Sequence, residues 1–290
     1  MTDNRLFIFG FGYTAHFVAN DLLALNFAIS GTSRHRKYTH DVLSSPYTYV
    51  DFSRELVEAQ LQNATHVLVS IPPLPDTGDL VLAQFKDLLK KYASQLQWVG
   101  YLSSTGVYGD HQGRWVDESS ESINPGKQGA LRLQTENTWL AFAKATELPL
   151  HIFRLAGIYG PHRNALTRLK SGKSQTIHKE GQYFSRIHVE DIAKIILASI
   201  QNLHPFSIYN VADDEPSSTQ DVDEFAAKLL NVAPPTLISF QNAVLSSMAQ
   251  EFYNHNRRVS NQKIKQELAV KLNYPDYREG LRYLYETKDY

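Results

Sequence analysis

The chain has 290 residues, of which 42% are hydrophobic and 20% charged, with a formal net charge of −1 and no cysteine. Its length supports one large α/β domain or a domain with a smaller lobe. The charge balance gives no reason to expect nucleic acid or an anionic membrane as a partner, and the lack of cysteine excludes disulfides and thiolate catalysis. No apolar run reaches the length of a membrane span and no signal segment precedes the first strand pattern, so we expect a soluble cytoplasmic protein.

The first predicted strand ends in a glycine turn. Large apolar side chains run from Leu6 to Phe9, and Gly10 and Gly12 follow in the spacing Gly-x-Gly-x-x-Ala. An amphipathic helix is predicted directly afterwards, over residues 16–25. A strand, a glycine turn and a helix in this order are typical of a site for a dinucleotide pyrophosphate, which binds at the helix N-terminus. We therefore predict cofactor contacts from Gly10, Gly12, Tyr13, Thr14 and Ala15.

A basic loop follows the second predicted strand, Phe27–Gly31. About twenty residues after the glycine turn, an NAD-binding protein usually carries an acidic residue for the ribose 2′-hydroxyl. This chain has Ser33, Arg34 and Arg36 there instead. A guanidinium forms a bidentate pair with the 2′-phosphate of NADP, whereas a carboxylate would repel it. The alternative is a solvated basic loop without a ligand; we favour NADP over NAD.

A third strand is predicted from Tyr47 to Val50, and Asp51 and Phe52 follow it. Asp51 either accepts a hydrogen bond from the adenine amino group, with Phe52 beside the ring, or caps the helix predicted over residues 54–62. Both interpretations remain open.

The fourth predicted strand, His66–Ser70, is stopped by Ile71 and Pro72. A loop at the carboxyl end of a central strand is where a cofactor ribose lies, so Ser70, Ile71 and Pro72 join the predicted cofactor site. Strands and helices continue to alternate, which predicts an α/β fold with a Rossmann-type, doubly wound parallel sheet. The later predictions are strands over 98–102, 150–154 and 207–211, and helices over 80–92, 128–146, 217–230, 259–270 and 277–285, with a further helix opened by residues 186–193.

Six motifs in this chain resemble, in the same order, those of the extended short-chain dehydrogenase/reductase superfamily, which includes nucleotide-sugar epimerases and dehydratases. They are the glycine turn, Ser103-Ser104 through Val107-Tyr108-Gly109, Arg154 through Tyr159-Gly160-Pro161, Arg186 to Asp191, Tyr209-Asn210-Val211-Ala212 and Arg257-Arg258-Val259-Ser260-Asn261. The resemblance extends over residues 5–285. We expect an NADP-binding Rossmann domain over residues 1–160, completed by residues 186–212, and a small C-terminal α/β substrate lobe from residues 161–185 and 213–290.

The resemblance also implies a catalytic serine and a Tyr-x-x-x-Lys pair on the helix that follows it. Ser104 matches the serine, which orients the substrate oxygen. Gln128 and Arg132 stand at the positions of the tyrosine and the lysine. Gln128 has no proton to lose near neutral pH, and Arg132 stays charged but cannot shuttle a proton. With a glycine turn one residue shorter than the family pattern, these departures resemble an atypical branch of the superfamily.

Two tyrosines after strand ends are candidates for the missing acid/base. Either Tyr108 or Tyr159 supplies the proton, helped by Arg132, or both rings only pack over the floor of the cleft. His188 is either catalytic, because an unperturbed histidine titrates near neutrality, or a packed or capping residue. We take Ser104, Tyr108 and Arg132 as the catalytic candidates.

Other charged residues have two interpretations each. Asp117-Glu118 is either a carboxylate pair over the cleft or a solvated pair in a polar loop. Arg257-Arg258 either binds a phosphate or carboxylate of a ligand or caps a surface helix. No His-x-x-x-His pattern or acidic cluster points to a metal, and we expect none.

Two functions remain open from the sequence. The first is an NADP-dependent oxidoreductase or epimerase/dehydratase for a nucleotide-sugar-like or other small carbonyl or alcohol substrate, with a non-standard acid/base. The second is a binding protein that senses NADP(H) or a ligand without turning it over. The helices over 80–92 and 128–146 would pair in a homodimer like that of the family. Their outer faces carry Leu131, Trp139 and Phe142, which is more apolar surface than one solvated helix needs, and some of that face must pack on the sheet.

Overall fold

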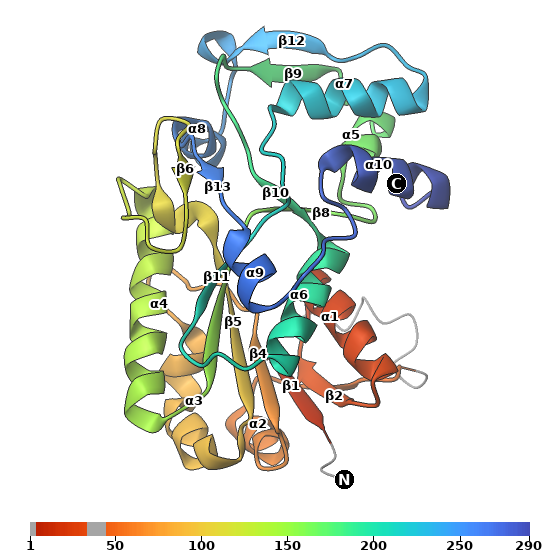
Figure 1. Ribbon diagram of the computed structural model, residues 1–290. Coiled ribbons are helices and arrows are strands. Elements are labelled where there is room, and N and C mark those ends of the chain that lie inside the picture. The colour runs from red at the N-terminus through yellow and green to blue at the C-terminus, as the bar shows by residue number, and fades with distance from the viewer. Residues whose placement is uncertain (1–3, 34–44) are drawn as a thin grey trace. The chain divides into compact units, whose positions relative to one another are not determined.

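The computed structural model describes residues 4–33 and 45–290, which form two compact units (Figure 1). The first unit comprises Met1–Ser104, Leu131–Arg154 and Ile192–Tyr209, and the second Thr105–Ala130, Leu155–Asp191 and Asn210–Tyr290. These boundaries, which follow contacts within the chain, differ from those of the predicted domains, which were defined by the ligand that each part would bind. The division into a cofactor-binding domain and a substrate lobe stays a prediction.

The first half of the described chain contains regularly alternating strands and helices. Its elements are β1 (Arg5–Phe9), α1 (Tyr13–Ala24), β2 (Ala28–Thr32), β3 (Thr48–Val50), α2 (Arg54–Leu61), β4 (His66–Val69), α3 (Leu80–Lys91), η2 (Ala93–Gln95), β5 (Trp98–Ser104), η3 (Thr105–Tyr108), β6 (Trp115–Val116) and α4 (Gly126–Thr146).

The second half has shorter elements between the last strands of the sheet. They are β7 (Leu150–Leu155), β8 (Gly157–Tyr159), α5 (Ala165–Lys170), β9 (Gln175–His178), β10 (Arg186–His188), α6 (Val189–Gln201), β11 (Ile208–Val211), α7 (Thr219–Leu230), β12 (Thr236–Ser239), η4 (Phe240–Asn242), α8 (Ser247–Asn254), β13 (Arg258–Val259), α9 (Gln262–Glu267) and α10 (Tyr277–Thr287).

The central sheet has seven strands in the order β11-β7-β5-β4-β1-β2-β3. The pairs β1–β2, β1–β4, β2–β3 and β4–β5 are all parallel. The reversal of strand order beside β1 is the topological switch point of a doubly wound sheet, and it lies where the glycine turn begins. This arrangement confirms the predicted Rossmann-type α/β fold.

The side chains of α2, α3 and α4 pack against one face of this sheet in a single apolar cluster. Trp139 and Phe142 of α4 belong to this cluster and are 0% and 5% exposed. The expectation that they form an apolar outer face was therefore wrong, because the sheet-facing side of α4 already buries them. Trp139 and Phe142 therefore do not support the predicted homodimer, which stays a prediction.

The second unit is held together by short parallel strand pairs and three helices. Strand β8 pairs with β10, β9 with β12 and β6 with β13. Helices α5, α7 and α10 share an apolar cluster that includes Tyr159 and Leu281.

Two sequence predictions for this unit differ from the structure. Residues 186–188 form strand β10 rather than the first turn of a helix, and the helix predicted over 259–270 is reduced to α9, after strand β13.

Candidate functional site

The glycine turn joins β1 to α1 with the geometry that its sequence predicts. Gly10 has a φ of +91°, and a Cβ there would lie 2.7 Å from Cγ1 of Ile71, so a larger residue would be both strained and crowded. The Gly10 N–H donates to Oγ1 of Thr32 at 3.0 Å, and the hydroxyl of Ser70 donates to the Gly10 carbonyl. The predicted ribose-loop residues Ser70 and Ile71 therefore brace the turn from the end of β4.

Gly12 is the N-cap residue of α1, so the first turn of the helix begins at this exposed glycine. Among the described residues, apart from the two chain neighbours of Gly12, no heavy atom lies within 4 Å of the Cβ that a larger residue would place there. Open space in front of a helix N-terminus, next to a turn that only glycine fits, suits a pyrophosphate. Thr14 and Ala15 are buried behind the turn, where they hold α1 close to the sheet.

The structure does not place the remaining predicted cofactor residues together at the glycine turn. Arg34 and Arg36 lie outside the described residues, and Ser33, which directly follows β2, is the last described residue before them. Phe52 packs edge-on against Phe9 and Phe85, with ring centroids 6.3 Å and 4.9 Å away, and so belongs to the sheet core. Asp51 is exposed, and it is not the N-cap of α2, which begins after Ser53. Pro72 is exposed on the loop after β4.

A buried charged network lies directly beside the predicted catalytic serine. Ser103, next to Ser104 at the end of β5, donates to Oε1 of Glu136 at 2.5 Å. Arg154 binds the same carboxylate through Nε at 3.2 Å and Nη2 at 2.8 Å, and both charged side chains are almost fully buried. Sequence analysis missed this network, although an arginine inside the fully buried and mostly apolar strand β7 was a visible signal.

The two residues at the positions of the missing pair lie one turn apart on α4. Gln128 is exposed, and Arg132 is half-buried with its Nη1 donating to the Leu102 carbonyl at 3.0 Å. Burial raises the pKa of Tyr101 on β5, and nearby Arg132 opposes that rise. Arg132 thus carries its charge to the end of β5, within the first unit.

In the second unit, Tyr108 is buried at 1% exposure at the end of η3. Its hydroxyl donates to Oδ1 of Asn210 at 2.6 Å. The Asn210 amide in turn donates to the Ser260 carbonyl, and Glu118 accepts the Asn210 backbone N–H at 2.7 Å. Glu118 is therefore not part of a solvated carboxylate pair, because it links the loop after η3 to the end of β11. Asp117 is exposed, and it accepts a hydrogen bond from the Ser119 hydroxyl.

His188 and Tyr159 belong to the interior of the second unit. His188 is fully buried among the rings of Tyr159, Tyr274 and Tyr283, and burial lowers its pKa to about 4. Burial, followed by the charge of Asp213, raises the pKa of Tyr159 well above its usual value. These environments fit the packed alternatives for both residues.

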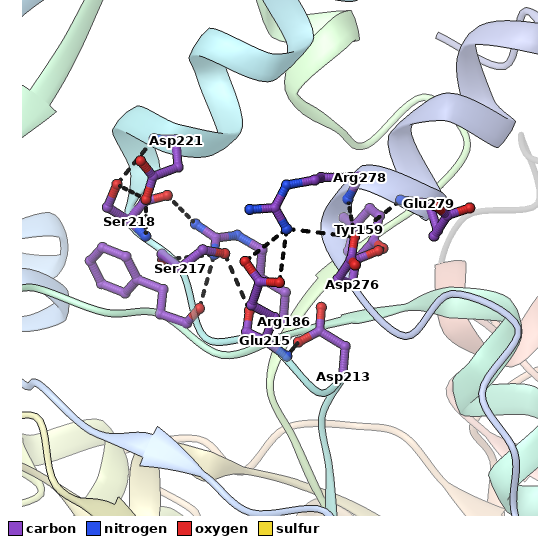
Figure 2. A network of polar contacts seen from close by, with 11 residues as sticks. Tyr159, Arg186, Asp213, Glu215, Ser217, Ser218, Asp221, Asp276, Arg278 and Glu279 are labelled. Atoms are coloured by element: carbon purple, nitrogen blue, oxygen red, sulfur yellow. Dashed lines mark hydrogen bonds and ion pairs between the residues drawn. The ribbon is translucent and has the colours of Figure 1, made fainter.

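Sequence analysis also missed a polar network around Arg186 in the second unit, shown in Figure 2. Arg186 Nη1 donates to the carbonyls of Phe184 and Ser217, each at 2.9 Å, and Arg278 Nη1 donates to both carboxylate oxygens of Glu215. Asp213 is 1% exposed, and its Oδ2 has no hydrogen-bond partner among the residues that the structure describes. Burial therefore raises the pKa of Asp213 well above its usual value, against the pull of the Arg186 charge.

Within residues 4–33 and 45–290, none of the helices combines the length and the apolar character needed to cross a membrane. The same part of the chain contains no group of three or more His, Asp or Glu side chains placed to hold a metal ion.

Comparisons with solved structures place this fold among known proteins. A functionally unknown conserved protein from Silicibacter pomeroyi is 43% identical over 98% of this chain and 99% of its own, with a TM-score of 0.90. The dTDP-glucose 4,6-dehydratase of Bacillus anthracis, solved with NAD, is 17% identical over 99% of this chain and 96% of its own, with a TM-score of 0.79. The UDP-glucose 4-epimerase of Thermotoga maritima, solved with UDP-glucose, is 12% identical over 98% of this chain and 99% of its own, with a TM-score of 0.80.

No curated protein sequence matches the chain. The family model described as the NAD dependent epimerase/dehydratase family matches residues 85–212, from α3 to just beyond β11. The glycine turn lies before that match, and its geometry agrees independently with a dinucleotide site. Over residues 85–212 the sequence is thus similar to the NAD dependent epimerase/dehydratase family, and the sheet order and overall structural likeness show the Rossmann-type fold of solved epimerases and dehydratases.

Proposed function

We propose that this protein is an NADP-dependent oxidoreductase or epimerase/dehydratase that acts on a nucleotide-sugar-like or other small carbonyl or alcohol substrate. The observation that carries the proposal is the glycine turn, where Gly10 has a positive φ and open space faces Gly12 at the start of α1. The match of residues 85–212 to the NAD dependent epimerase/dehydratase family supports a dinucleotide as the ligand. When bound, such a cofactor supplies hydride transfer at its nicotinamide ring.

The chain itself would then bind and orient the reactants. The backbone at Gly10 and Gly12 receives the pyrophosphate, and Ser70 holds the Gly10 carbonyl in place. From the sequence, Ser104 is the candidate that orients the substrate oxygen, and Tyr108 and Arg132 are the candidates for the proton exchange. For Tyr108 to do so, its hydroxyl must leave Asn210, to which it donates at 2.6 Å.

The preference for NADP rests on the residues that follow β2. Ser33, Arg34 and Arg36 stand where an NAD-specific site would carry an acidic side chain. A guanidinium presents paired N–H donors that match the oxygens of a 2′-phosphate.

A specific observation also favours a second function, that of a binding protein which senses NADP(H) without turnover. Gln128 cannot act as an acid or base, and the Tyr108 hydroxyl is buried and already hydrogen-bonded. With Gln128 unable to transfer a proton and the Tyr108 hydroxyl engaged, the protein would bind a cofactor but lack a proton donor.

Fluorescence titration with NADPH and NADH tests the proposal. We expect tighter binding of NADPH than of NADH, and a loss of that preference in Arg34→Ala. The matched control is Arg54→Ala, which removes a surface arginine that pairs with Asp87 and should leave both affinities unchanged. Binding of neither nucleotide would overturn the proposal. Binding without hydride exchange against a panel of carbonyl substrates would favour the sensing protein.

A further inference from the structure

A glutamate of α8 places its carboxyl group against the first residue of α4, within the second unit. A Cβ added at Gly126 would overlap Oε1 of Glu251, so the carboxyl lies directly on the backbone there. Oε1 is buried and has no hydrogen-bond partner in the described part of the chain, while some of the Glu251 side chain is exposed. A buried carboxyl oxygen without a donor is costly, so its presence calls for a compensating role.

The charge of Glu251 is also not neutralised by a neighbour. His255, one helical turn further along, has its ring hydrogen-bonded to the backbone of Asn124. Burial, and after it the charge of Arg257, lowers the pKa of His255, while the charge of Glu251 opposes that shift. The imidazole is therefore uncharged near neutral pH, and no cation within residues 4–33 and 45–290 forms an ion pair with Glu251.

The contact with Gly126 brings Glu251 to the helical turn on which the expected acid/base is missing. Gly126 precedes Gln128 by two residues, so both belong to the first turn of α4. A Cβ at Gly129, on the same turn, would overlap the carbonyl of Gly106 in η3, which follows the candidate catalytic serine. The first turn of α4 thus contacts both η3 and the carboxyl of Glu251.

Helix capping does not account for this carboxyl. An acidic side chain that caps a helix accepts a backbone N–H of the first turn, as Asp79 does from Leu82 at 2.8 Å at the start of α3. Among the described residues, Glu251 accepts no such hydrogen bond from α4. Only the field of the helix dipole favours the carboxylate there, and this field leaves its oxygens free to accept a proton.

We propose that Glu251 is the general acid/base of the reaction, in the role of the tyrosine that Gln128 replaces. When the substrate alcohol is oxidised to a carbonyl, its hydroxyl proton passes to the Glu251 carboxylate and a hydride passes from its carbon to the oxidised nicotinamide ring. Reduction of the carbonyl reverses both transfers, with the proton supplied by the Glu251 carboxylic acid. Glu251 breaks no hydrogen bond of its own in this step, whereas the Tyr108 hydroxyl must leave Asn210. The inference rests on the proposed function, because it names the acid/base of that reaction.

Glu251→Gln tests the assignment in an assay of hydride exchange between NADPH and a panel of small aldehydes, ketones and nucleotide-linked keto sugars. We expect kcat to fall about 100-fold or more, the usual contribution of a general acid/base, while the affinity for NADPH stays unchanged. Glu121→Gln is the matched control, since Glu121 is an exposed glutamate of the same unit, and it should keep the kcat of the parent. Added formate should restore turnover to Glu251→Ala, because a free carboxylate can exchange the proton in the space that the side chain leaves.

The melting temperature without cofactor is the measurement that detects a purely structural role. Because its carboxyl forms no hydrogen bond in the described chain, Glu251→Gln should melt no lower than the parent. A lower melting temperature, together with no rescue of Glu251→Ala by formate, would overturn the proposal and assign Glu251 to the stability of α4. Glu251→Asp covers the case in which Glu251→Gln fails to fold; it keeps a carboxyl group on a shorter side chain, so it should lose part of kcat while keeping the NADPH affinity.

Two further outcomes separate this inference from the proposed function. Full turnover in Glu251→Gln would overturn the inference and leave the proposed function standing, with Tyr108→Phe as the next variant to compare. A parent protein that exchanges hydride with no member of the panel would overturn the proposed function, and the inference with it.

Discussion

The hydroxyl of Tyr108 donates a 2.6 Å hydrogen bond to Oδ1 of Asn210, and both side chains are almost completely buried. This bond joins the turn after β5 to the end of β11, two segments 102 residues apart in the chain. A group that is proposed to exchange a proton is therefore also a structural contact, and the two roles can be separated experimentally.

Tyr108→Phe should lower the free energy of unfolding by about 1–3 kcal/mol, because it leaves a buried amide oxygen without a donor. Tyr159→Phe is the control, since the Tyr159 hydroxyl has only a 3.4 Å contact with the Asp276 carbonyl and should cost less. Chemical denaturation measures both. Should Tyr108→Phe retain full stability, the bond to Asn210 contributes nothing. If substrate turnover also survives the change, Tyr108 is not the acid/base.

The buried pair of Glu136 and Arg154 makes a second prediction. Glu136→Gln should destabilise the protein by about 3–5 kcal/mol, because Arg154 would be left charged, buried and without its carboxylate. The double variant Glu136→Leu/Arg154→Met should recover much of that loss, since it removes both desolvated charges.

The control for this experiment is Asp87→Asn, which breaks the exposed pair with Arg54. Solvent screens that pair, so its loss should change the melting temperature little. A small effect of Glu136→Gln, similar to that of Asp87→Asn, would show that the network beside Ser104 does not stabilise the fold.

Two buried histidines of the first unit predict loss of stability in acid. Burial lowers the pKa of His66 and of His151 from 6.5 to about 4. The unfolded chain therefore binds these protons more readily, so stability is full above about pH 6.5 and falls as the pH drops towards 4. Each histidine accounts for about 3 kcal/mol over that range.

His66→Phe should remove one of these two protons from the pH dependence of unfolding. The new ring can keep the edge-on contact that His66 makes with Phe27, at 5.1 Å between centroids. Urea denaturation at pH 7.0 and pH 5.0 measures the difference between the variants. An unchanged pH dependence in His66→Phe would mean that His66 is not the titrating group.

Asp213 predicts the opposite pH dependence. Burial raises its pKa in the folded state above the ordinary 3.8, so the stabilisation from its protonated form is lost as the pH rises above that value. Asp213→Asn keeps a neutral group of the same shape and an acceptor for the Glu215 N–H. We expect this variant to match or exceed the parent in melting temperature at pH 8, where ionisation of a buried carboxyl is most costly.

Asp117→Asn is the matched control for Asp213→Asn. Ser119 lowers the pKa of the exposed Asp117, so its replacement should not increase stability at pH 8. A marked loss of stability in Asp213→Asn would instead show that Asp213 is ionised and compensates the Arg186 charge.

Short-range sequence pattern was enough for the Rossmann-type sheet and for the glycine turn. The strand from Leu6 to Phe9 and the spacing of Gly10 and Gly12 depend on neighbours along the chain, and the structure agrees with them. The expectation about Trp139 and Phe142 was wrong because periodicity shows that a helix has an apolar side but not what covers it.

Contacts between distant segments had to come from the tertiary structure. Ser103, Glu136 and Arg154 stand 33 and 18 residues apart along the chain and share one buried carboxylate. Likewise, adjacent Arg257 and Arg258 are the same residue type, yet one lies on an aromatic ring and the other beside a turn. Sequence specifies the charge of such side chains, but burial and partners determine what that charge does, and both depend on which distant segments the folded chain brings together.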